Sequence, residues 1–356
     1  MKNTETLTQE AITLLKNLIE TPSFSSEEEH TAALIEKWFV VNEIPFEREN
    51  NNIWAYNATF DKSKPTLLLN SHHDTVRPNQ AYTKDPFKAI VEEGKLYGLG
   101  SNDAGGCLVS LLATFVHFYA SENLPYNIVM VASAEEESSG KKGLNSVLKR
   151  LPELECAIVG EPTLMQLAIA EKGLLVLDVK VKGTPSHAAH QNDDNAIYKT
   201  IPVMEWFKNY PFEKISEQLG LVKMTVTQIN AGKQHNVVPS ECDLVVDIRV
   251  NDCYTNHEIL QIVKENVNAD VTPRSMNLSS SSIPASHGLV KAGIALGRTT
   301  YGSPTLSDQS VLSCKSLKLG PGDTLRSHSA DEFIYLYEIE EGIQLYIKML
   351  EDFLKQ

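Results

Sequence analysis

Three apolar segments in the first half of the chain constrain its fold more than any other feature. They read PTLLLNS (65–71), NIVMVASA (127–134) and CAIVGE (156–161), and their apolar residues follow one another instead of alternating with polar ones. Strands of this kind are covered on both faces, as in a sheet with helices on each side. Apolar residues recur at helical spacing at 7–20, 26–42, 105–122, 141–151 and 338–353. We therefore predict an α/β domain.

The pattern changes near Lys172. An alternating strand (174–183), a helix (195–210), two strands (221–232, 240–250), a helix (255–267) and a strand around 269–278 follow one another. This β-α-β-β-α-β order is ferredoxin-like, with helices on one face of a small sheet. We predict a catalytic domain formed by residues 1–171 and 282–356, and an inserted α+β domain formed by residues 172–281.

Composition limits the partners of the protein. Aspartate and glutamate outnumber lysine and arginine by 46 to 32, and the net charge of −14 argues against nucleic acid or an anionic membrane. The N-terminal segment MKNTETLTQE has no apolar signal core, and no apolar run approaches the roughly 20 residues that span a bilayer. The five cysteines contain no C-x-x-C pair, as expected for buried reduced thiols. We expect a cytoplasmic protein.

Histidines and carboxylates follow each of the three apolar segments. His72, His73 and Asp74 follow the first, Glu135, Glu136 and Glu137 follow the second, and Glu161 ends the third. Asp103 lies in the glycine-rich turn LYGLGSNDAGG, and His328 follows the strand-like SLKLGPGD near the C-terminus. In an open α/β sheet, ligands bind beyond the carboxyl ends of the strands, so we expect these side chains to meet at one edge.

Each of these residues has an ordinary interpretation by itself. A lone histidine is more often a core or surface residue than a ligand, a strand-end aspartate is more often a helix cap, and three successive glutamates more often form a solvated loop. Taken together, histidines and carboxylates are the ligands of zinc or a similar divalent ion. Five ligands that share one carboxylate suit two metal ions about 3.5–4 Å apart. The sequence therefore predicts a metal site.

Five segments resemble, in order and spacing, the motifs of the acetylornithine deacetylase and succinyl-diaminopimelate desuccinylase family. They are NSHHDTV, GLGSNDAGG, SAEEESSGKKG, IVGEPT and GPGDTLRSHSADEF. The inserted domain resembles that family too, through GTPSHAAH and NVVPSECDLVVDIR. The family also includes aminoacylases and glutamate carboxypeptidases. The resemblance covers nearly the whole chain and implies a zinc-exopeptidase-like catalytic domain with an inserted lid or dimerisation domain.

The resemblance implies two Zn²⁺ ions per subunit, for which Co²⁺ can substitute. Asp103 would bridge them, with His72 and Glu161 on one ion and Glu137 and His328 on the other.

The resemblance also implies catalytic roles for two further residues. Asp74 would orient the His72 imidazole. Glu136 would be the general base, which takes a proton from water and passes it to the leaving amine. Glu135 receives no role. The register stays open, because a shift by one residue would exchange the roles of Glu136 and Glu137.

In the inserted domain, the resemblance implies that His187 stabilises the tetrahedral oxyanion across the interface of a homodimer. Asn236 and Arg249 would contact the substrate, and arginine suits a substrate carboxylate because it donates two parallel hydrogen bonds. An ion pair within the inserted domain is an equally good interpretation of Arg249.

The chain departs from the family pattern at two places. Gly105 stands where the family motif D-x-K-G has lysine, and TLSDQSVL (305–312) lacks the arginine that often follows the motif T-S-D. The second departure favours a neutral acyl group such as acetyl over succinyl, although Arg298 or Arg326 could compensate.

We therefore expect metal-dependent hydrolysis of the amide bond of a small N-acyl amino acid, most like deacetylation of N-acetylornithine in arginine biosynthesis. Desuccinylation, or dipeptidase or carboxypeptidase activity, would use the same chemistry. A non-catalytic metal-binding protein that has kept the fold is a further alternative, but the presence of Asp74, Glu136 and all five ligand positions argues against it.

Overall fold

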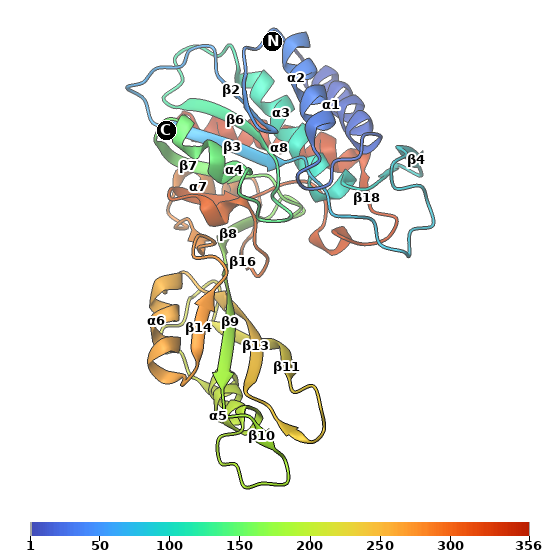
Figure 1. Cartoon of the computed structure of the whole chain (residues 1–356). Helices are drawn as coiled ribbons and strands as arrows, with labels where there is room; N and C mark the ends of the chain where they lie inside the picture. The colour runs from blue at the N-terminus through green and yellow to red at the C-terminus, as the bar shows by residue number, and fades with distance from the viewer. Residues whose placement is uncertain (1, 356) are drawn as a thin grey trace. The chain divides into compact units, whose positions relative to one another are not determined.

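The computed structural model describes residues 2–355 and divides them into two compact units (Figure 1). Unit 1 comprises the residues up to Ile169, Ser282–Tyr301 and the residues from Ser307 on. Unit 2 comprises Ala170–Ser281 and Gly302–Leu306. The short segment Gly302–Leu306 lies in the part of the chain that the sequence assigns to the catalytic domain.

Unit 1 contains most of a mixed sheet with the strand order β1-β2-β6-β3-β7-β17-β8-β15, in which β16 also pairs with β8. The strands are β1 (Glu47–Glu49), β2 (Asn52–Tyr56), β3 (Thr66–His72), β6 (Asn127–Ser133), β7 (Leu154–Val159), β8 (Leu167–Glu171), β15 (Ser281–Ser282), β16 (Thr300–Ser303) and β17 (Lys315–Lys318). The three apolar segments form β3, β6 and β7, and β3 runs parallel to both of the others. The predicted α/β fold is confirmed.

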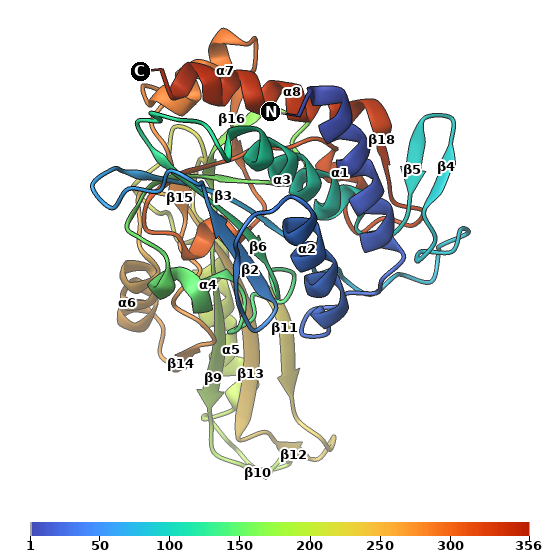
Figure 2. The ribbon, with the colours of Figure 1, turned by 90° about the horizontal axis from the view of Figure 1, so that it is seen from above.

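Helices cover both faces of this sheet. Successive residues of its central strands point to opposite sides, so their apolar side chains contribute to a core on each face. Leu67 and Leu69 of β3 belong to the larger core, which also contains residues of α1, α2, α3, α7 and α8, whereas Leu68 belongs to a smaller core with α4. The helices are α1 (Thr4–Ile19), α2 (Glu29–Val41), α3 (Gly106–Phe118), α4 (Leu144–Val147), α7 (Gly288–Ala295) and α8 (Leu336–Phe353). Figure 2 shows α1, α3 and α8 side by side, in mutual contact. No helix of residues 2–355 is long and apolar enough to cross a membrane.

One local prediction needs correction, and one small sheet was not predicted. The helix expected at 141–151 is only α4, followed by a single 3₁₀ turn, Leu148–Arg150. Gly143 immediately precedes the helix, and Pro152 follows shortly after the turn, so few residues between them can be helical. A small antiparallel sheet, formed by β4 (Ile90–Glu92), β5 (Lys95–Tyr97) and β18 (Phe333–Tyr335), is absent from the prediction.

Unit 2 has the predicted β-α-β-β-α-β order. Its elements are β9 (Gly173–Lys182), β10 (Ser186–His187), α5 (Ala196–Asn209), β11 (Lys223–Ala231), β12 (Val237–Val238), β13 (Glu241–Val250), α6 (Asn256–Asn266) and β14 (Asp270–Pro273). β9, β11, β13 and β14 form an antiparallel sheet in the order β11-β13-β9-β14. Thr255 and Glu258 form a capping box that starts α6.

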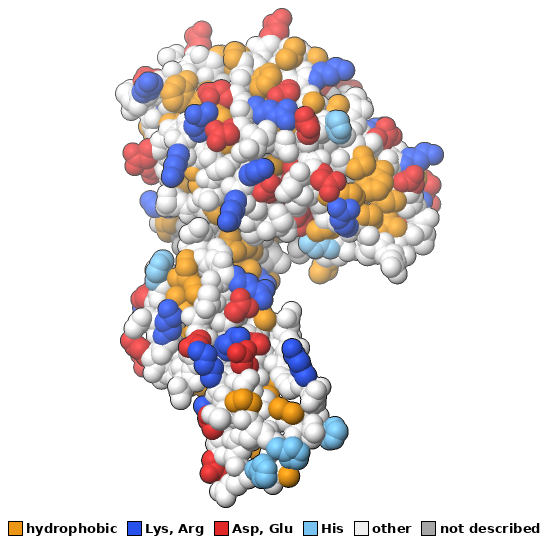
Figure 3. All heavy atoms as spheres, viewed as in Figure 1, with side chains coloured by type: hydrophobic (Ala, Val, Ile, Leu, Met, Phe, Trp, Pro, Cys, Tyr) orange, Lys and Arg blue, Asp and Glu red, His pale blue; other side chains and the backbone are white. Residues whose placement is uncertain are grey.

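The sheet of unit 2 has one apolar and one charged face. Alternate residues of β9 and β13 pack with α5 and α6 in one core. On the other face, acidic and basic side chains are interspersed over β9, β13 and β14 (Figure 3), and they include the ion pairs Arg274–Asp178 at 2.8 Å and Lys180–Glu241 at 2.7 Å.

Candidate metal centre

The carboxyl ends of β3, β6 and β7 bring His72, Glu136 and Glu161 together. His72 is the last residue of β3, and the two glutamates lie in the loops after β6 and β7. His72 Nε2 lies 3.8 Å from Glu161 Oε1 and 4.0 Å from Glu136 Oε2. The parallel pairing of these strands therefore converts three separate segments of sequence into one cluster of side chains.

Asp103 lies between the two predicted histidine ligands. It belongs to the irregular turn Ser101–Gly105, which leads into α3, and its peptide bond with Ala104 is cis. One carboxylate oxygen, Oδ1, lies 3.4 Å from His72 Nε2, and the other, Oδ2, lies 3.6 Å from His328 Nε2. His328 Nε2 also lies 3.0 and 3.1 Å from the two carboxylate oxygens of Glu137.

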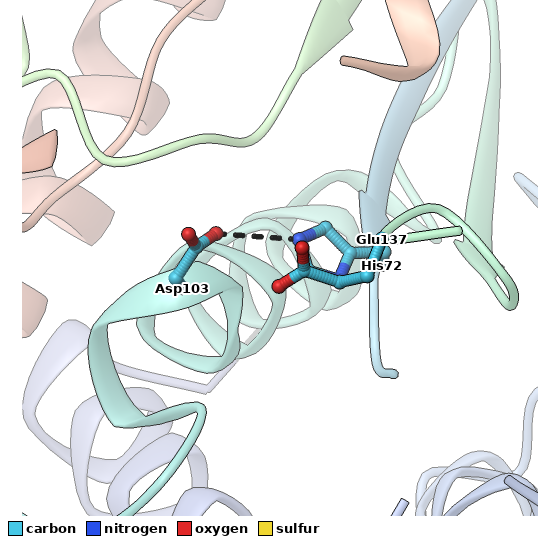
Figure 4. A group of neighbouring side chains, drawn as sticks. All are labelled: His72, Asp103 and Glu137. Atoms are coloured by element: carbon cyan, nitrogen blue, oxygen red, sulfur yellow. Dashed lines mark ion pairs between the residues drawn. The ribbon is translucent and has the colours of Figure 1, made fainter. Parts of the chain in front are cut away.

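Ligand atoms of His72, Asp103 and Glu137 lie within 4.8 Å of one another, as do those of His72, Glu136 and Glu161. Figure 4 shows the first of these triplets, with the Asp103 and Glu137 carboxylates beside the His72 ring. This grouping differs from the predicted pairs, because Glu136 stands with His72 and Glu161. Both glutamates are therefore within reach of the centre.

The donor chemistry fits a divalent metal ion. His72 Nε2 is buried and has no hydrogen-bond partner among residues 2–355. Buried polar atoms are nearly always satisfied, so a ring nitrogen that faces carboxylates without a hydrogen bond suits metal ligation. The other ring nitrogen, Nδ1, donates to the backbone carbonyl of Asp74 at 3.0 Å, which leaves the Nε2 lone pair toward the cluster.

The Asp74 carboxylate holds the loop that carries the glutamates. It lies 3.4 Å from His72 Nδ1 but accepts hydrogen bonds from the backbone N–H groups of Glu136 at 3.1 Å and Glu137 at 3.2 Å, and from Ser25 Oγ at 2.7 Å. Asp74 therefore orients the histidine mainly through its own carbonyl, while its side chain joins the ends of β3 and β6.

Burial, hydrogen bonds and neighbouring charges shift the pKa values of the groups in this cluster. Burial raises the pKa of Glu136 well above its usual range, and burial together with the Asp103 charge raises the pKa of Glu161 to about 8. The hydrogen bond to Glu137 raises the pKa of His328 to about 9. Each shift reduces the net negative charge of the centre, as a bound cation would.

Two neighbours of the predicted ligands have structural partners instead. His73 is held by Thr31 Oγ1 at 2.9 Å and the Asn51 carbonyl at 2.8 Å, and burial lowers its pKa to about 4. Glu135 accepts hydrogen bonds from Ser26 Oγ at 2.9 Å and from the backbone N–H of Lys142 at 3.0 Å, so it closes the glutamate loop.

In unit 2, His187 and Asn236 lie close together. His187 pairs with Val237 between β10 and β12, and the backbone carbonyl of Asn236 accepts a hydrogen bond from Ala188 at 2.9 Å. Histidine side chains gather at this end of unit 2 (Figure 3). His187 Nδ1 accepts a hydrogen bond from the backbone N–H of Ala189 at 3.1 Å, so the neutral ring carries its proton on Nε2 and can donate it.

Arg249 is not brought to His187. It lies near the far end of β13, about 26 Å along the strand from Glu241 at about 3.3 Å per residue. Its guanidinium group donates to both oxygens of Asp247, at 2.9 and 3.2 Å. This ion pair within unit 2 is the structural alternative that the sequence leaves open.

Three polar residues of the C-terminal motifs make contacts that the sequence did not reveal. Asp308, from the motif noted for its missing arginine, is buried and accepts a hydrogen bond from Ser133 Oγ at 2.5 Å, and burial raises its pKa to about 6. Gln309 is buried and donates to Ser316 Oγ at 3.0 Å. The Arg326 guanidinium forms a bidentate pair with Glu338 at 2.7 and 2.9 Å, so it is already engaged.

Comparisons with known proteins identify the family of the chain. Residues 68–352 match the sequence model of peptidase family M20/M25/M40. A probable carboxypeptidase from Paracoccidioides lutzii is 27% identical over 327 residues, which cover 85% of this chain and 73% of that protein. A succinyl-diaminopimelate desuccinylase from Rickettsia bellii is 27% identical over 272 residues, covering 71% of this chain and 70% of that protein.

Among solved structures, a dinuclear metal-binding peptidase of the M20 family from Bacillus subtilis superposes with a TM-score of 0.74. The match is 15% identical and covers 99% of each chain, so it concerns the fold.

Proposed function

The chain belongs to peptidase family M20/M25/M40, and on that premise we propose that it hydrolyses the amide bond of an N-acyl amino acid with the help of two metal ions. The observation that carries this proposal is the Asp103 carboxylate, whose two oxygens face His72 and His328 at 3.4 and 3.6 Å. A carboxylate between two histidines suits a bridging ligand, and a relative of similar fold is described as dinuclear.

The proposed ligands are His72 and Glu161 for one ion, Glu137 and His328 for the other, and Asp103 for both. Zn²⁺ is the expected ion, with Co²⁺ as a substitute, because both accept imidazole and carboxylate ligands. Bound ions would polarise the substrate carbonyl and favour ionisation of water near pH 7.

Glu136 is the proposed general base. Its backbone N–H is fixed by Asp74, and its carboxylate oxygen Oε2 lies 4.0 Å from His72 Nε2, at the edge of the cluster. The burial that raises its pKa suits a group that takes a proton from water on Oε2 and then gives it to the leaving nitrogen. The contact between Glu137 and His328 supports Glu137, rather than Glu136, as the ligand.

His187 is the proposed donor to the oxyanion of the tetrahedral intermediate, acting across a homodimer interface. The proton on its Nε2 supports the donor role. Features of unit 2 support the dimer: β11 is an edge strand of the sheet, and α5 exposes Tyr198 at 69% and Ile201 at 51%. Asn236, beside His187, is the proposed substrate contact, whereas the pairing of Arg249 with Asp247 weakens that role for Arg249.

An acetyl group is the proposed acyl group, with N-acetylornithine as the first substrate to test. The engagement of Arg326 by Glu338 removes one of the two cations that could have bound a succinyl carboxylate. Such a deacetylase would serve arginine biosynthesis in the cytoplasm. Desuccinylase or carboxypeptidase activity is the second candidate, because similar proteins carry those names.

A substrate panel on metal-loaded protein tests the proposal. N-acetylornithine, N-succinyl-diaminopimelate and a dipeptide are each incubated with Zn²⁺- and Co²⁺-loaded enzyme, and metal content is measured on the same samples. Glu136→Gln is the control, which should retain both metals and lose turnover. Protein that holds two metal ions per chain and cleaves none of these amides would refute the proposed function.

A further inference from the structure

Glu332 reaches from the segment that carries His328 to the turn that carries Asp103. Its side chain is 1% exposed. Oε1 accepts hydrogen bonds from the backbone N–H groups of Asn102 at 2.8 Å and of Asp103 itself at 2.9 Å. Oε2 accepts a third from the N–H of Gly100 at 3.2 Å. Each of these bonds ends on the turn that presents the central carboxylate of the metal centre.

The turn also holds the C-terminal segment in return. Asn102 Oδ1 accepts a hydrogen bond from the backbone N–H of Asp323 at 3.0 Å, and Asn102 Nδ2 donates to the Asp323 carbonyl at 3.0 Å. Gly322 lies so close that a Cβ atom there would be 2.5 Å from Asn102 Oδ1. The two segments are more than 200 residues apart in sequence, yet each fixes the backbone of the other.

The segment of His328 needs such external support. His328 and Asp331 are in left-handed backbone conformations, with φ of 57° and 52°. Residues other than glycine keep this conformation only where surrounding contacts fix it. The contacts here include Asn79 Nδ2, which donates to the His328 carbonyl at 3.2 Å, and the N–H of Thr83, which donates to the Asp331 carboxylate at 2.8 Å.

We propose that Glu332 is a positioning residue that fixes the spacing between Asp103 and His328 and thereby sets the metal affinity of the centre. Asn102 completes this clamp from the other side. The proposal rests on the proposed function, because it requires both residues to be metal ligands. A buried acid whose hydrogen bonds all go to backbone N–H groups of one turn is suited to holding that turn in place.

Replacing Glu332 by glutamine tests the clamp with little change in shape. The amide oxygen can still accept from Asn102 and Asp103, but the amide nitrogen then faces the N–H of Gly100, and neither can accept. The turn should move to separate these two donors, and Asp103 moves with it. Loss of such supporting contacts typically weakens metal binding by about 10–100-fold.

The experiment titrates Co²⁺ into metal-free full-length protein, followed by calorimetry and by the visible absorption of bound Co²⁺. Glu332→Gln and Asn102→Ala are compared with wild type and with Asn127→Asp as matched control. Asn127 is also buried and clamps backbone through its side chain, to the Asp61 N–H and carbonyl at 2.8 Å each, but at the opposite end of β6. Urea unfolding of the metal-free variants measures stability separately.

We expect Glu332→Gln and Asn102→Ala to bind Co²⁺ about 10–100-fold more weakly, with an altered spectrum. Asn127→Asp should lose stability and keep wild-type affinity. Wild-type affinity and spectrum in Glu332→Gln would overturn the proposal, as would equal weakening in Asn127→Asp. If Glu332→Gln does not fold, Asn102→Ala decides by the same criteria. Failure of wild type to bind Co²⁺ would instead overturn the proposed function, and this inference with it.

Discussion

Replacing Gly105 by lysine, which the resembling family carries at this position, is expected to destabilise the protein. A Cβ atom at position 105 would lie 2.4 Å from the Gly100 carbonyl oxygen and 2.6 Å from Leu15 Cδ1. The N–H of Gly105 donates to the same Gly100 carbonyl at 2.9 Å, which brings the two residues together. Any side chain at position 105 therefore enters space that is already occupied.

The size of the effect depends on which neighbour can move. The Leu15 methyl group can rotate away. The Gly100 carbonyl cannot, because Gly100 has a φ of 75° and its N–H donates to Glu332. Overpacking of this kind costs about 1–3 kcal/mol, and loss of the Gly105 hydrogen bond adds about 1 kcal/mol. We expect a loss of about 3 kcal/mol, or a fall in Tm of roughly 6–12 °C.

Urea unfolding of the metal-free protein measures this loss. Gly105→Ala isolates the effect of the Cβ atom, and Gly105→Lys adds the longer side chain. Gly94→Ala is the control, because Gly94 has a φ of 74° but a Cβ atom there would have no other atom within 4 Å, so it should lose only about 1 kcal/mol. If Gly105→Ala is as stable as wild type, or loses less than Gly94→Ala, the steric reasoning is wrong.

Three further predictions concern Asp74 in the centre, His187 in unit 2 and His117 in α3. Asp74→Asn should weaken metal binding by about 10–100-fold, measured by Co²⁺ titration, because asparagine keeps only one acceptor oxygen for the N–H groups of Glu136 and Glu137, which bond to different oxygens of Asp74. Unchanged affinity would contradict this. His187→Ala should lower kcat by about 10²–10³-fold, and mixing it with Glu136→Ala should restore partial activity only if the two residues serve one site from different subunits. Burial lowers the pKa of His117, so the unfolded state binds more protons below about pH 6.5 and the free energy of unfolding falls on acidification. Urea unfolding between pH 7.5 and pH 5 should show a smaller loss of this free energy in His117→Asn than in wild type.

The sequence predicted those parts of the fold that depend on a single continuous segment. The apolar runs that became β3, β6 and β7 can be recognised because burial on both faces gives consecutive apolar residues in the middle of each strand. The strands of unit 2 can be recognised from the sequence as well, because apolar and polar residues alternate in a sheet that is covered on one face. By contrast, β4 has three residues and is largely exposed, so its pairing with β5 leaves no apolar pattern to detect.

The sequence also predicted that the candidate ligands gather, because parallel strands end at one edge of the sheet. What the sequence could not show are contacts through space between distant segments. The need for glycine at position 105 comes from the Gly100 carbonyl and from Leu15 in α1, and the function of Glu332 comes from N–H groups some 230 residues earlier in the chain. The Arg249–Asp247 pair illustrates the opposite case, because residues two apart on a strand share one face and the pairing was already a stated alternative.

The assignment of roles within the glutamate triplet rests on backbone geometry rather than on the carboxylates alone. Asp74 accepts the N–H of Glu136 with Oδ1 and the N–H of Glu137 with Oδ2, so the register of the loop is fixed by contacts that involve neither glutamate side chain. Given that register, the Glu137 carboxylate meets His328 at 3.0 Å while Glu136 Oε2 lies 4.0 Å from His72. A shift by one residue would need both hydrogen bonds to Asp74 to be remade. The fixed loop therefore supports the proposed roles, with Glu137 as ligand and Glu136 as general base.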